Sequence, residues 1–357
     1  MPRESVCLKV AKANGEKTLK LADQLHITDK NLTIRKENEG FLCIPIVRRL
    51  SEQELSLLRE LAPEAQTSTA VFREKEKKPK TLLDVLETQL PPHLLASVPK
   101  ALDVVGDIAI VEIPAELEPH RNAVGEAILK AHRNVRTVLA KAGAVSGVYR
   151  LRNLGVIAGE PRTVTLHKEN GCSYYVDVAK AYFSPRLSHE HARVASLVRD
   201  GETVVDLFAG VGPFAVLIAK THPDARVYAL DINADAVELL EKNIRLNRVE
   251  NRAQPILGDA RQIIAERLAG VADRVIMNLP EKAAEYVDVA CLALKRSGGV
   301  VHFYGFFRSP DSLDNAQQRF RVAVAKAGRN MAEITCAKTV RETAPFEYQA
   351  VLDAEIR

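Results

Sequence analysis

The sequence predicts an α/β protein with a doubly wound, mostly parallel sheet in its C-terminal half and two smaller α/β or α+β domains before it. Three observations support this fold class. From about residue 192, strands of Val, Ile and Leu alternate with amphipathic helices, as in a parallel sheet covered on both faces. Residues 333–356 hold two strand-like runs around a proline, which predicts a closing antiparallel hairpin. The stretch "FREKEKKPKT" has no apolar periodicity and indicates a linker.

The first domain is expected over residues 1–72, with the linker over 73–82. "SVCLKVAK" and "GFLCIPIV" have the composition of strands, and "SEQELSLLRELA" is typical of a helix. Ser51 and Glu54 have the spacing of a capping box, which predicts that this helix begins just after Ser51.

The second domain is expected over residues 83–175. "LLDVLETQL" predicts a helix, "ALDVVGDIAIVEIP" a strand, and "RNAVGEAILKAHRNVRTVLAKAG" a helix. "RTVTLHKENGCSYYVDVAK" reads as two strands around the turn residues Glu169, Asn170 and Gly171.

The third domain is expected over residues 176–357. Its periodicity predicts strands at 203–210, 226–233, 253–260, 274–280 and 298–307, with helices at 192–199, 213–222, 234–248 and 283–295. No internal repeat is visible.

Composition excludes several classes of protein. The hydrophobic fraction is 46% and the charged fraction 27%, and no run approaches the length of a membrane span, so we expect a soluble protein without a membrane partner. The N-terminal residues lack the pattern of a signal or transit peptide, which favours the cytoplasm. The five cysteines are scattered with no Cys-x-x-Cys, so neither a disulfide framework nor a metal site is expected.

Basic residues gather in the second domain. Residues 121–170 hold nine Lys and Arg against three Glu, within a chain whose net charge is +4. Such an excess is compatible with a plain solvated surface, and equally with a surface for a polyanion.

A glycine-rich loop follows the first strand of the third domain. In "VVDLFAGVGPFAVLIA", Gly210 and Gly212 allow the backbone to approach a ligand, and Asp231 follows at about the interval of a carboxylate that binds a ribose diol. The same letters satisfy a dinucleotide pattern, so an NAD-dependent oxidoreductase is an alternative. Asp206 favours a ligand with an ammonium group, because a carboxylate so close would repel a pyrophosphate.

Further polar residues end the next strands. Asp231, Asp259 and the Asn278–Pro280 turn follow successive strands, and ligands of parallel sheets bind at these carboxyl ends. The ordered set predicts S-adenosylmethionine as cofactor. Asp206 would hold its ammonium, Asp231 its ribose, and Asp259 with the Ala260 amide its adenine.

The chain resembles the archaeal and eukaryotic tRNA (guanine-N1)-methyltransferases that modify position 37 of tRNA. The resemblance rests on "VVGDIAIVEIP", "YRLRNLGVIAGEPRTVTLHKENG", "VDVAKAYFSPRLSHEHARV", "VVDLFAGVGPFA", "VIMNLP" and "YQAVLDAEI". It implies a class I, Rossmann-like S-adenosylmethionine-dependent methyltransferase domain and methyl transfer to N1 of the guanosine beside the anticodon.

The resemblance also assigns roles at the site. Guanine N1 carries a proton at neutral pH, so its alkylation needs a base and a group that stabilises charge on O6. Glu190 matches the family's base and Arg150 its O6 partner; a first-turn helix carboxylate and a phosphate contact are the alternative roles from the residues alone. Tyr182, Asn278 and Pro280 are expected around the flipped-out base.

Other residues are expected to bind the cofactor or the RNA. The cofactor set comprises Asp206, Phe208, Gly210, Gly212, Asp231, Ile232, Asp259, Ala260, Asn278 and His191. His191 stands where archaeal members commonly have Arg, which puts a contact from its side chain in doubt. Arg186, Arg152 and Ser184 are expected to contact the substrate.

The resemblance implies a monomer that binds tRNA, with the middle domain on the anticodon arm and the first domain on the outer corner. Related alternatives are aminocarboxypropyl transfer in the wybutosine pathway and carbon methylation of a tricyclic guanine at the same position. A tRNA-binding protein without activity is a further alternative. Cytosine-C5 methylation is disfavoured because "NLPEKA" has no cysteine nucleophile, and adenine-N6 methylation because Glu281 replaces an aromatic residue.

Overall fold

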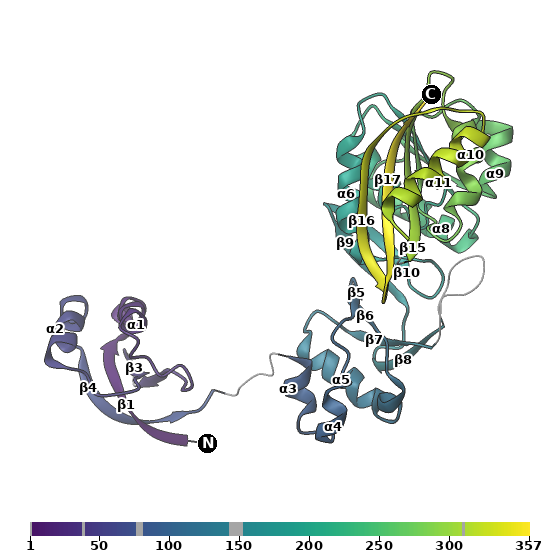
Figure 1. The fold of residues 1–357 in the computed structure, drawn as a ribbon. Helices are drawn as coiled ribbons and strands as arrows, with labels where there is room; N and C mark the ends of the chain where they lie inside the picture. Colours follow the sequence, from purple (N-terminus) through teal and green to yellow (C-terminus); the bar gives the residue numbers. More distant parts are fainter. Residues whose placement is uncertain (1, 38–39, 76–80, 143–152, 309–310) are drawn as a thin grey trace. The chain divides into compact units, whose positions relative to one another are not determined.

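The computed structural model describes residues 2–37, 40–75, 81–142, 153–308 and 311–357. The chain divides into two compact units, residues 1–79 and 80–357, and each is described by itself (Figure 1). Within the described ranges, no helix has both the length and the apolar character to cross a membrane.

The first unit is a small antiparallel sheet with two helices. It comprises β1 (Pro2–Ala11), η1 (Lys12–Asn14), α1 (Gly15–Gln24), β2 (Arg35–Glu37), β3 (Phe41–Pro45), α2 (Glu52–Leu61) and β4 (Gln66–Arg73), with strand order β2-β3-β1-β4. Leu8, Ile44 and Leu58 lie in its core. The predicted strands and helix are confirmed, and Ser51 and Glu54 form the predicted capping box.

The second unit begins with a four-stranded sheet of order β5-β6-β7-β8. Its elements are α3 (Leu82–Leu86), α4 (Pro92–Leu95), β5 (Asp103–Val105), β6 (Ile108–Val111), η2 (Ala115–His120), α5 (Arg121–Ala131), β7 (Thr137–Lys141) and β8 (Leu154–Gly159). The apolar face of α5 packs Val124 and Ile128 against Val138 of the sheet.

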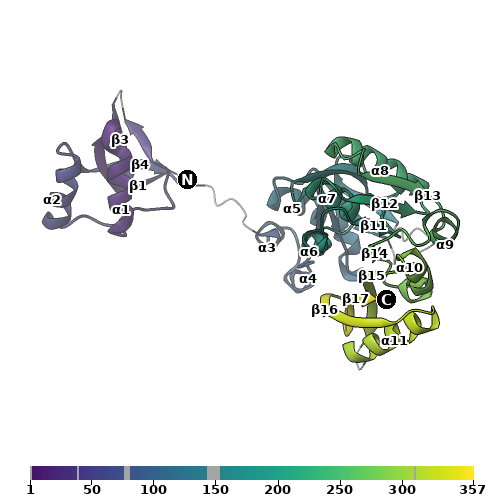
Figure 2. The ribbon, with the colours of Figure 1, turned by 90° about the horizontal axis from the view of Figure 1, so that it is seen from above.

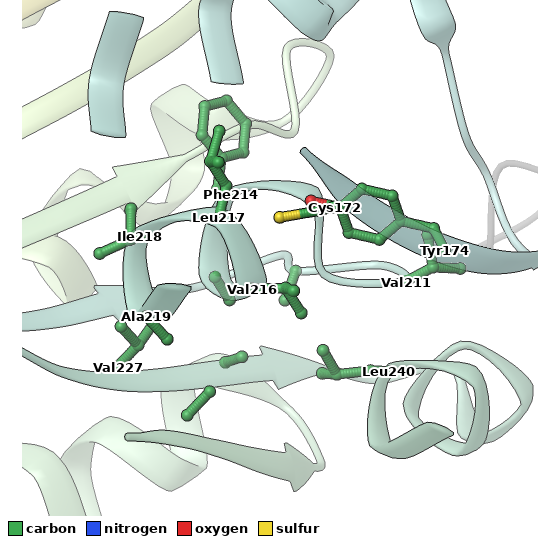
Figure 3. Packing of buried hydrophobic residues seen from close by; sticks show 14 of the residues in the cluster. Cys172, Tyr174, Val211, Phe214, Val216, Leu217, Ile218, Ala219, Val227 and Leu240 are labelled. Atoms are coloured by element: carbon green, nitrogen blue, oxygen red, sulfur yellow. The ribbon is translucent and has the colours of Figure 1, made fainter. Parts of the chain in front are cut away.

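A β-hairpin with a two-residue turn follows this sheet in the chain and leads to the C-terminal part. β9 (Val164–Glu169) pairs with β10 (Cys172–Asp177) through Asn170 and Gly171, whose φ angles of 47° and 74° suit the tight turn that the sequence predicted. Because β10 alternates buried and outward residues, Cys172 and Tyr174 enter the main core (Figure 3).

Side-chain amides attach this hairpin to α8. Asn243 accepts a hydrogen bond from Tyr175 N at 2.6 Å and donates to Tyr175 O at 3.1 Å. Asn247 repeats the pattern on Ser173 N at 3.0 Å and Ser173 O at 2.7 Å. These amides satisfy backbone groups of β10 that a neighbouring strand would otherwise satisfy.

The main sheet has the order β13-β12-β11-β14-β15-β17-β16. Its strands are β11 (Thr203–Asp206), β12 (Arg226–Asp231), β13 (Ala253–Leu257), β14 (Arg274–Met277), β15 (Gly299–Arg308), β16 (Met331–Ala344) and β17 (Glu347–Ile356). The first five run parallel, whereas β17 is antiparallel to both neighbours. The predicted doubly wound sheet with a closing hairpin is confirmed.

Helices cover both faces of this sheet (Figure 2). They are η3 (Pro185–Leu187), α6 (Ser188–Leu197), α7 (Pro213–Thr221), α8 (Ala234–Asn247), α9 (Ala260–Ile263), the π-helical turn η4 (Ile264–Leu268), η5 (Ala283–Tyr286), α10 (Val287–Ala293) and α11 (Leu313–Lys326). One core contains Val194, Phe214 and Leu240 from α6 to α8. The other contains Cys291 from α10 and Phe320 from α11, a helix that the sequence analysis did not predict.

Candidate active site

A cavity lies at the carboxyl ends of β11, β12, β13 and β14, where the sequence placed a ligand. Eight predicted residues line it together: Phe208, Gly210, Asp231, Ile232, Asp259, Ala260, Asn278 and His191. Tyr182 and Ser184 line it from the other side. The structure therefore brings together residues from five separate segments of the chain.

The glycine loop closes tightly on the end of the sheet. Gly212 has a φ of 91° and is the N-cap of α7, and a Cβ there would lie 2.3 Å from a methyl carbon of Leu240. Gly210, with a φ of 56°, donates its N–H to Asp231 Oδ2 at 2.7 Å. Gly212 therefore allows the loop to pack closely against Leu240, whereas Gly210 lines the cavity itself.

Asp206 lies behind this cavity and is fully buried. Its Oδ1 accepts a hydrogen bond from Phe208 N at 3.3 Å, but its Oδ2 has no hydrogen-bond partner among the described residues. Burial raises the pKa of Asp206 to about 7. A buried acceptor without a partner is uncommon and is suited to a positively charged donor.

The other two aspartates are held by backbone groups. Asp231 also accepts from Asn233 N at 2.9 Å, and burial raises its pKa above the ordinary range. Asp259 caps α9 by accepting from Arg261 N at 2.8 Å. Beside them, the rings of Phe208 and Tyr286 meet edge to face at 5.0 Å, which gives this end of the cavity an apolar wall.

A second cavity adjoins the first. Tyr182, Phe183, Ser184 and Glu281 line both, and Arg186 lines the second. Arg186 is exposed and forms an ion pair with Asp103 of β5, which ties the predicted substrate segment to the middle sheet. The two cavities are therefore neighbours that share part of their lining.

Arg341 of β16 organises the boundary between the two cavities. It donates to Ser184 Oγ at 2.9 Å, to the Tyr182 hydroxyl at 3.1 Å and to Gln349 Oε1 at 2.9 Å. Gln349 in turn donates to Asn278 Oδ1 at 3.4 Å. The C-terminal hairpin thus fixes two predicted base-contacting residues from opposite sides.

Glu190 lies on α6 and is 2% exposed, but it does not line either cavity. Its oxygens contact Lys338 Nζ at 2.7 Å, Arg193 Nε at 2.8 Å and the Tyr304 hydroxyl at 3.0 Å. Burial alone would raise the pKa of Glu190, but hydrogen bonds from Lys338 and Arg193 outweigh it and lower the pKa. Ser188 is the first residue of α6 and Glu190 lies in its first turn, as expected for the alternative role of a first-turn helix carboxylate.

His191 faces the cofactor cavity with its side chain. Its Nδ1 lies 2.7 Å from Glu169 Oε1, and its ring meets Phe214 edge to face at 4.6 Å. Burial alone would raise the pKa of Glu169, but the nearby imidazoles of His167 and His191 lower it to about 2. The ionised Glu169 therefore accepts the Nδ1–H of His191 and fixes the orientation of the ring.

Pro280, Arg150 and Arg152 were also predicted at this site. Pro280 is buried and lines a separate apolar hollow between β15 and α11. Arg150 and Arg152 lie outside the described residues. Sequence reasoning also missed Tyr304, Lys338, Arg341 and Asp353, which lie in strands whose alternation gave no sign of a site.

Comparison with family models identifies all three parts of the chain. Residues 165–332 match the TRM5/TYW2 methyltransferase domain, residues 82–163 the TYW2 N-terminal domain, and residues 7–54 the tRNA methyltransferase 5 N-terminal domain.

Curated proteins are similar over the whole chain. The tRNA (guanine(37)-N(1))-methyltransferase Trm5b of Pyrococcus abyssi is 36% identical over 352 residues, covering 99% of both chains. The Trm5b of Methanocaldococcus jannaschii is 34% identical over 353 residues, covering 98% of both. The tRNA 4-demethylwyosine(37)-methyltransferase Taw21 of Saccharolobus solfataricus is 33% identical over 71% of this chain and 93% of its own.

Solved structures agree with these matches. A complex of aTrm5 with tRNALeu has a TM-score of 0.78 at 34% identity and covers 99% of this chain and all of its own. TYW2 of P. horikoshii, in complex with MeSAdo, has a TM-score of 0.65 at 28% identity over 77% of this chain and 97% of its own.

Proposed function

The chain belongs to the TRM5/TYW2 methyltransferase family, and we propose that it transfers a methyl group from S-adenosylmethionine to N1 of guanosine 37 in tRNA. The observation that carries the proposal is the pair of adjoining cavities. One has the residues of a cofactor site, and the other shares Tyr182 and Ser184 with it. A base in the second cavity would lie next to a methyl donor in the first.

The residues of the first cavity fit S-adenosylmethionine, which supplies an electrophilic methyl group on a sulfonium. Asp206 carries a buried oxygen without a partner among the described residues, and an ammonium group would supply the missing donor. Asp231 lines the cavity and follows the glycine loop at about the sequence interval of a carboxylate that binds a ribose. Asp259 with the Ala260 amide offers an acceptor and a donor for adenine. Phe208 and Tyr286 provide the apolar contact that a purine needs.

Glu190 is the proposed general base. Its removal of the N1 proton would leave the N1 electron pair free to attack the methyl carbon, while Tyr182 and Asn278 hold the base edge-on to the cofactor cavity. The resemblance assigns stabilisation of O6 to Arg150, which lies outside the described residues and keeps that role as a prediction.

The proposed RNA partner is consistent with the charge of the middle domain. Residues 121–170 carry six more Lys and Arg than Glu, which suits contact with a phosphate backbone. We assign this surface to the anticodon arm, and residues 1–72 to the outer corner of tRNA. We expect the enzyme to act as a cytoplasmic monomer.

The decisive experiment identifies the product. The protein is incubated with S-adenosylmethionine and tRNA transcripts that carry G or A at position 37, and the digested nucleosides are analysed. N1-methylguanosine from the G transcript alone supports the proposal. An aminocarboxypropyl nucleoside would overturn it in favour of the wybutosine-pathway alternative. The similarity of this chain to TYW2 is the reason to test for that product. Methylation of a tRNA that already bears a tricyclic guanine would add the carbon-methylation activity that Taw21 is named for.

The base assignment has its own test. Glu190→Gln should slow methyl transfer by about 10²- to 10⁴-fold at neutral pH, the usual contribution of a general base. Partial recovery at high pH is expected, because guanine N1 then loses its proton without help. His189→Gln, an exposed position on the same helix, is the matched control and should keep the wild-type rate. An unchanged rate in Glu190→Gln would refute the assignment.

The role of the first unit can be tested by truncation. Because residues 1–79 form a compact unit with its own core, a chain starting after this unit keeps the active-site fold. We expect slower methylation of full-length tRNA and an unchanged rate on an isolated anticodon stem-loop. Equal rates of the full and shortened proteins on both RNAs would contradict the proposed contact with the outer corner.

A further inference from the structure

Glu190 is fully occupied in this structure. Oε2 accepts from Arg193 and from the Tyr304 hydroxyl, and Oε1 contacts Lys338 at 2.7 Å. Leu187 and His191, which flank it in the chain, both line the cofactor cavity, whereas Glu190 does not. The carboxylate is thus close to the site but bound to other groups.

The two contacts on Oε2 are held rigidly. Arg193 also pairs with Asp353 of β17, whose Oδ1 lies 2.7 Å from His302 Nδ1. His302 continues through Nε2 to Arg274, which pairs with Glu202. His302 and Tyr304 are fully buried in β15, so movement there would disturb several buried partners at once.

Lys338 is different from these partners. Its side chain is 37% exposed, compared with 16% for Arg193, and it reaches from β16 to Glu190 on α6. The Glu190 carboxylate is buried, but the Lys338 ammonium is partly exposed and is therefore open to competition from a phosphate group. Lys338 is therefore the partner of Glu190 that a phosphate group can reach.

We propose that Lys338 is a positioning residue that holds Glu190 Oε1 in the RNA-free protein and releases it when tRNA binds. The proposal rests on the proposed function, in which Glu190 is the base. Release leaves Oε1 free to accept the N1 proton: the N1–H bond breaks, the N1 electron pair forms the bond to the methyl carbon, and the sulfur–methyl bond breaks with its electron pair left on sulfur. Glu190 remains anchored through Oε2 during this step.

The charges around Glu190 make the proposal testable by pH. The groups that face it are Arg193 on its own helix, Tyr304 and His302 on β15, Cys336 and Lys338 on β16, and Asp353 on β17. Removing Lys338 leaves the effect of burial on Glu190 opposed by Arg193 and by the hydrogen bond from Tyr304. The pKa of Glu190 in the RNA-free protein should then rise, because one close opposite charge is lost.

The experiment measures proton uptake when full-length tRNA binds to Lys338→Met and to wild type from pH 5 to pH 8, by calorimetry in buffers of different ionisation enthalpy and without S-adenosylmethionine. In the RNA-free wild type Lys338 lowers the pKa of Glu190, and release should raise that pKa, so tRNA binding should be accompanied by proton uptake at the acid end of the range. In the Met variant the pKa of Glu190 is already raised before tRNA binds, so the uptake should be smaller than in wild type. Lys338→Arg should restore the wild-type profile, since it keeps the charge. Lys338→Gln serves as a second neutral variant should the Met side chain impair folding.

Lys295→Met is the matched control. Lys295 pairs with Asp273 at 2.7 Å, its side chain is 42% exposed, and it lies outside both cavities. It should show the wild-type pH profile. An unmoved profile in both neutral Lys338 variants overturns the proposal. So does a shift that persists after Glu190→Gln is added, since it would not come from Glu190. A wild-type rate in Glu190→Gln alone would instead refute the base assignment.

Discussion

Replacing Asp206 with Asn should stabilise the cofactor-free protein, and more so at higher pH. Burial raises the pKa of Asp206 to about 7, against an ordinary value of 3.8. A carboxyl whose pKa is higher in the folded state contributes stability that is full below pH 3.8 and is lost as pH rises to about 7. Asn does not titrate, so the variant avoids this loss.

The magnitude follows from the shift. A difference of about three pKa units at 1.36 kcal/mol each amounts to about 4 kcal/mol above pH 7. Between pH 5 and pH 8, wild type loses stability only up to the folded-state pKa of about 7. This loss amounts to about 3 kcal/mol of unfolding free energy. The unfolding free energy of Asp206→Asn relative to wild type should therefore increase by about 3 kcal/mol from pH 5 to pH 8.

Urea unfolding at the two pH values measures this difference, without added S-adenosylmethionine. Asp224→Asn, at an exposed position, controls for general charge effects and should show the same difference at both pH values. Binding of S-adenosylmethionine should weaken in Asp206→Asn, because its ammonium loses a carboxylate. A stability difference that does not change with pH, or a variant that is less stable at pH 8 than at pH 5 relative to wild type, would refute the reasoning.

Three further predictions concern the loop, the hairpin and the second cavity. Gly212→Ala should cost about 1 to 3 kcal/mol of unfolding free energy, because it adds a 2.3 Å clash with Leu240 to an unfavourable φ. Gly171 also has a positive φ but has open space around it, so Gly171→Ala should cost less in the same thermal or urea assay. Asn243→Ala should cost about 1 to 3 kcal/mol, since it leaves buried backbone groups of β10 and Val211 without partners, and an unchanged midpoint in urea would contradict that view. Arg341→Met should lower kcat with little change in S-adenosylmethionine affinity, because Arg341 holds Tyr182 and Ser184, which line both cavities, rather than the aspartates predicted to hold the cofactor; an intact kcat would remove it from the positioning of that wall.

Local patterns determined much of the C-terminal fold. Strands buried on both faces read as runs of Val, Ile and Leu, and the Asn170–Gly171 pair specified a tight turn because both residues adopt positive φ at low cost. The glycine loop and the aspartates at successive strand ends were predictable for the same reason: in a parallel sheet, the carboxyl end of each strand lies at one edge. Eight of the predicted cofactor residues line one cavity as a result.

Tertiary structure alone decided which groups surround the proposed base. Tyr304 contacts Glu190 across 114 positions of sequence and Arg341 contacts Tyr182 across 159, and neither strand carries a local sign of these contacts. The sequence also placed Asp206 directly on the ligand, whereas packing puts it behind the cavity with one oxygen unpartnered among the described residues. Periodicity reports which face of a strand is buried, but partners depend on how the closing hairpin adds to the sheet. The sequence by itself therefore determined the sheet and its ligand edge, and the arrangement of β15, β16 and β17 decided how Glu190 is held.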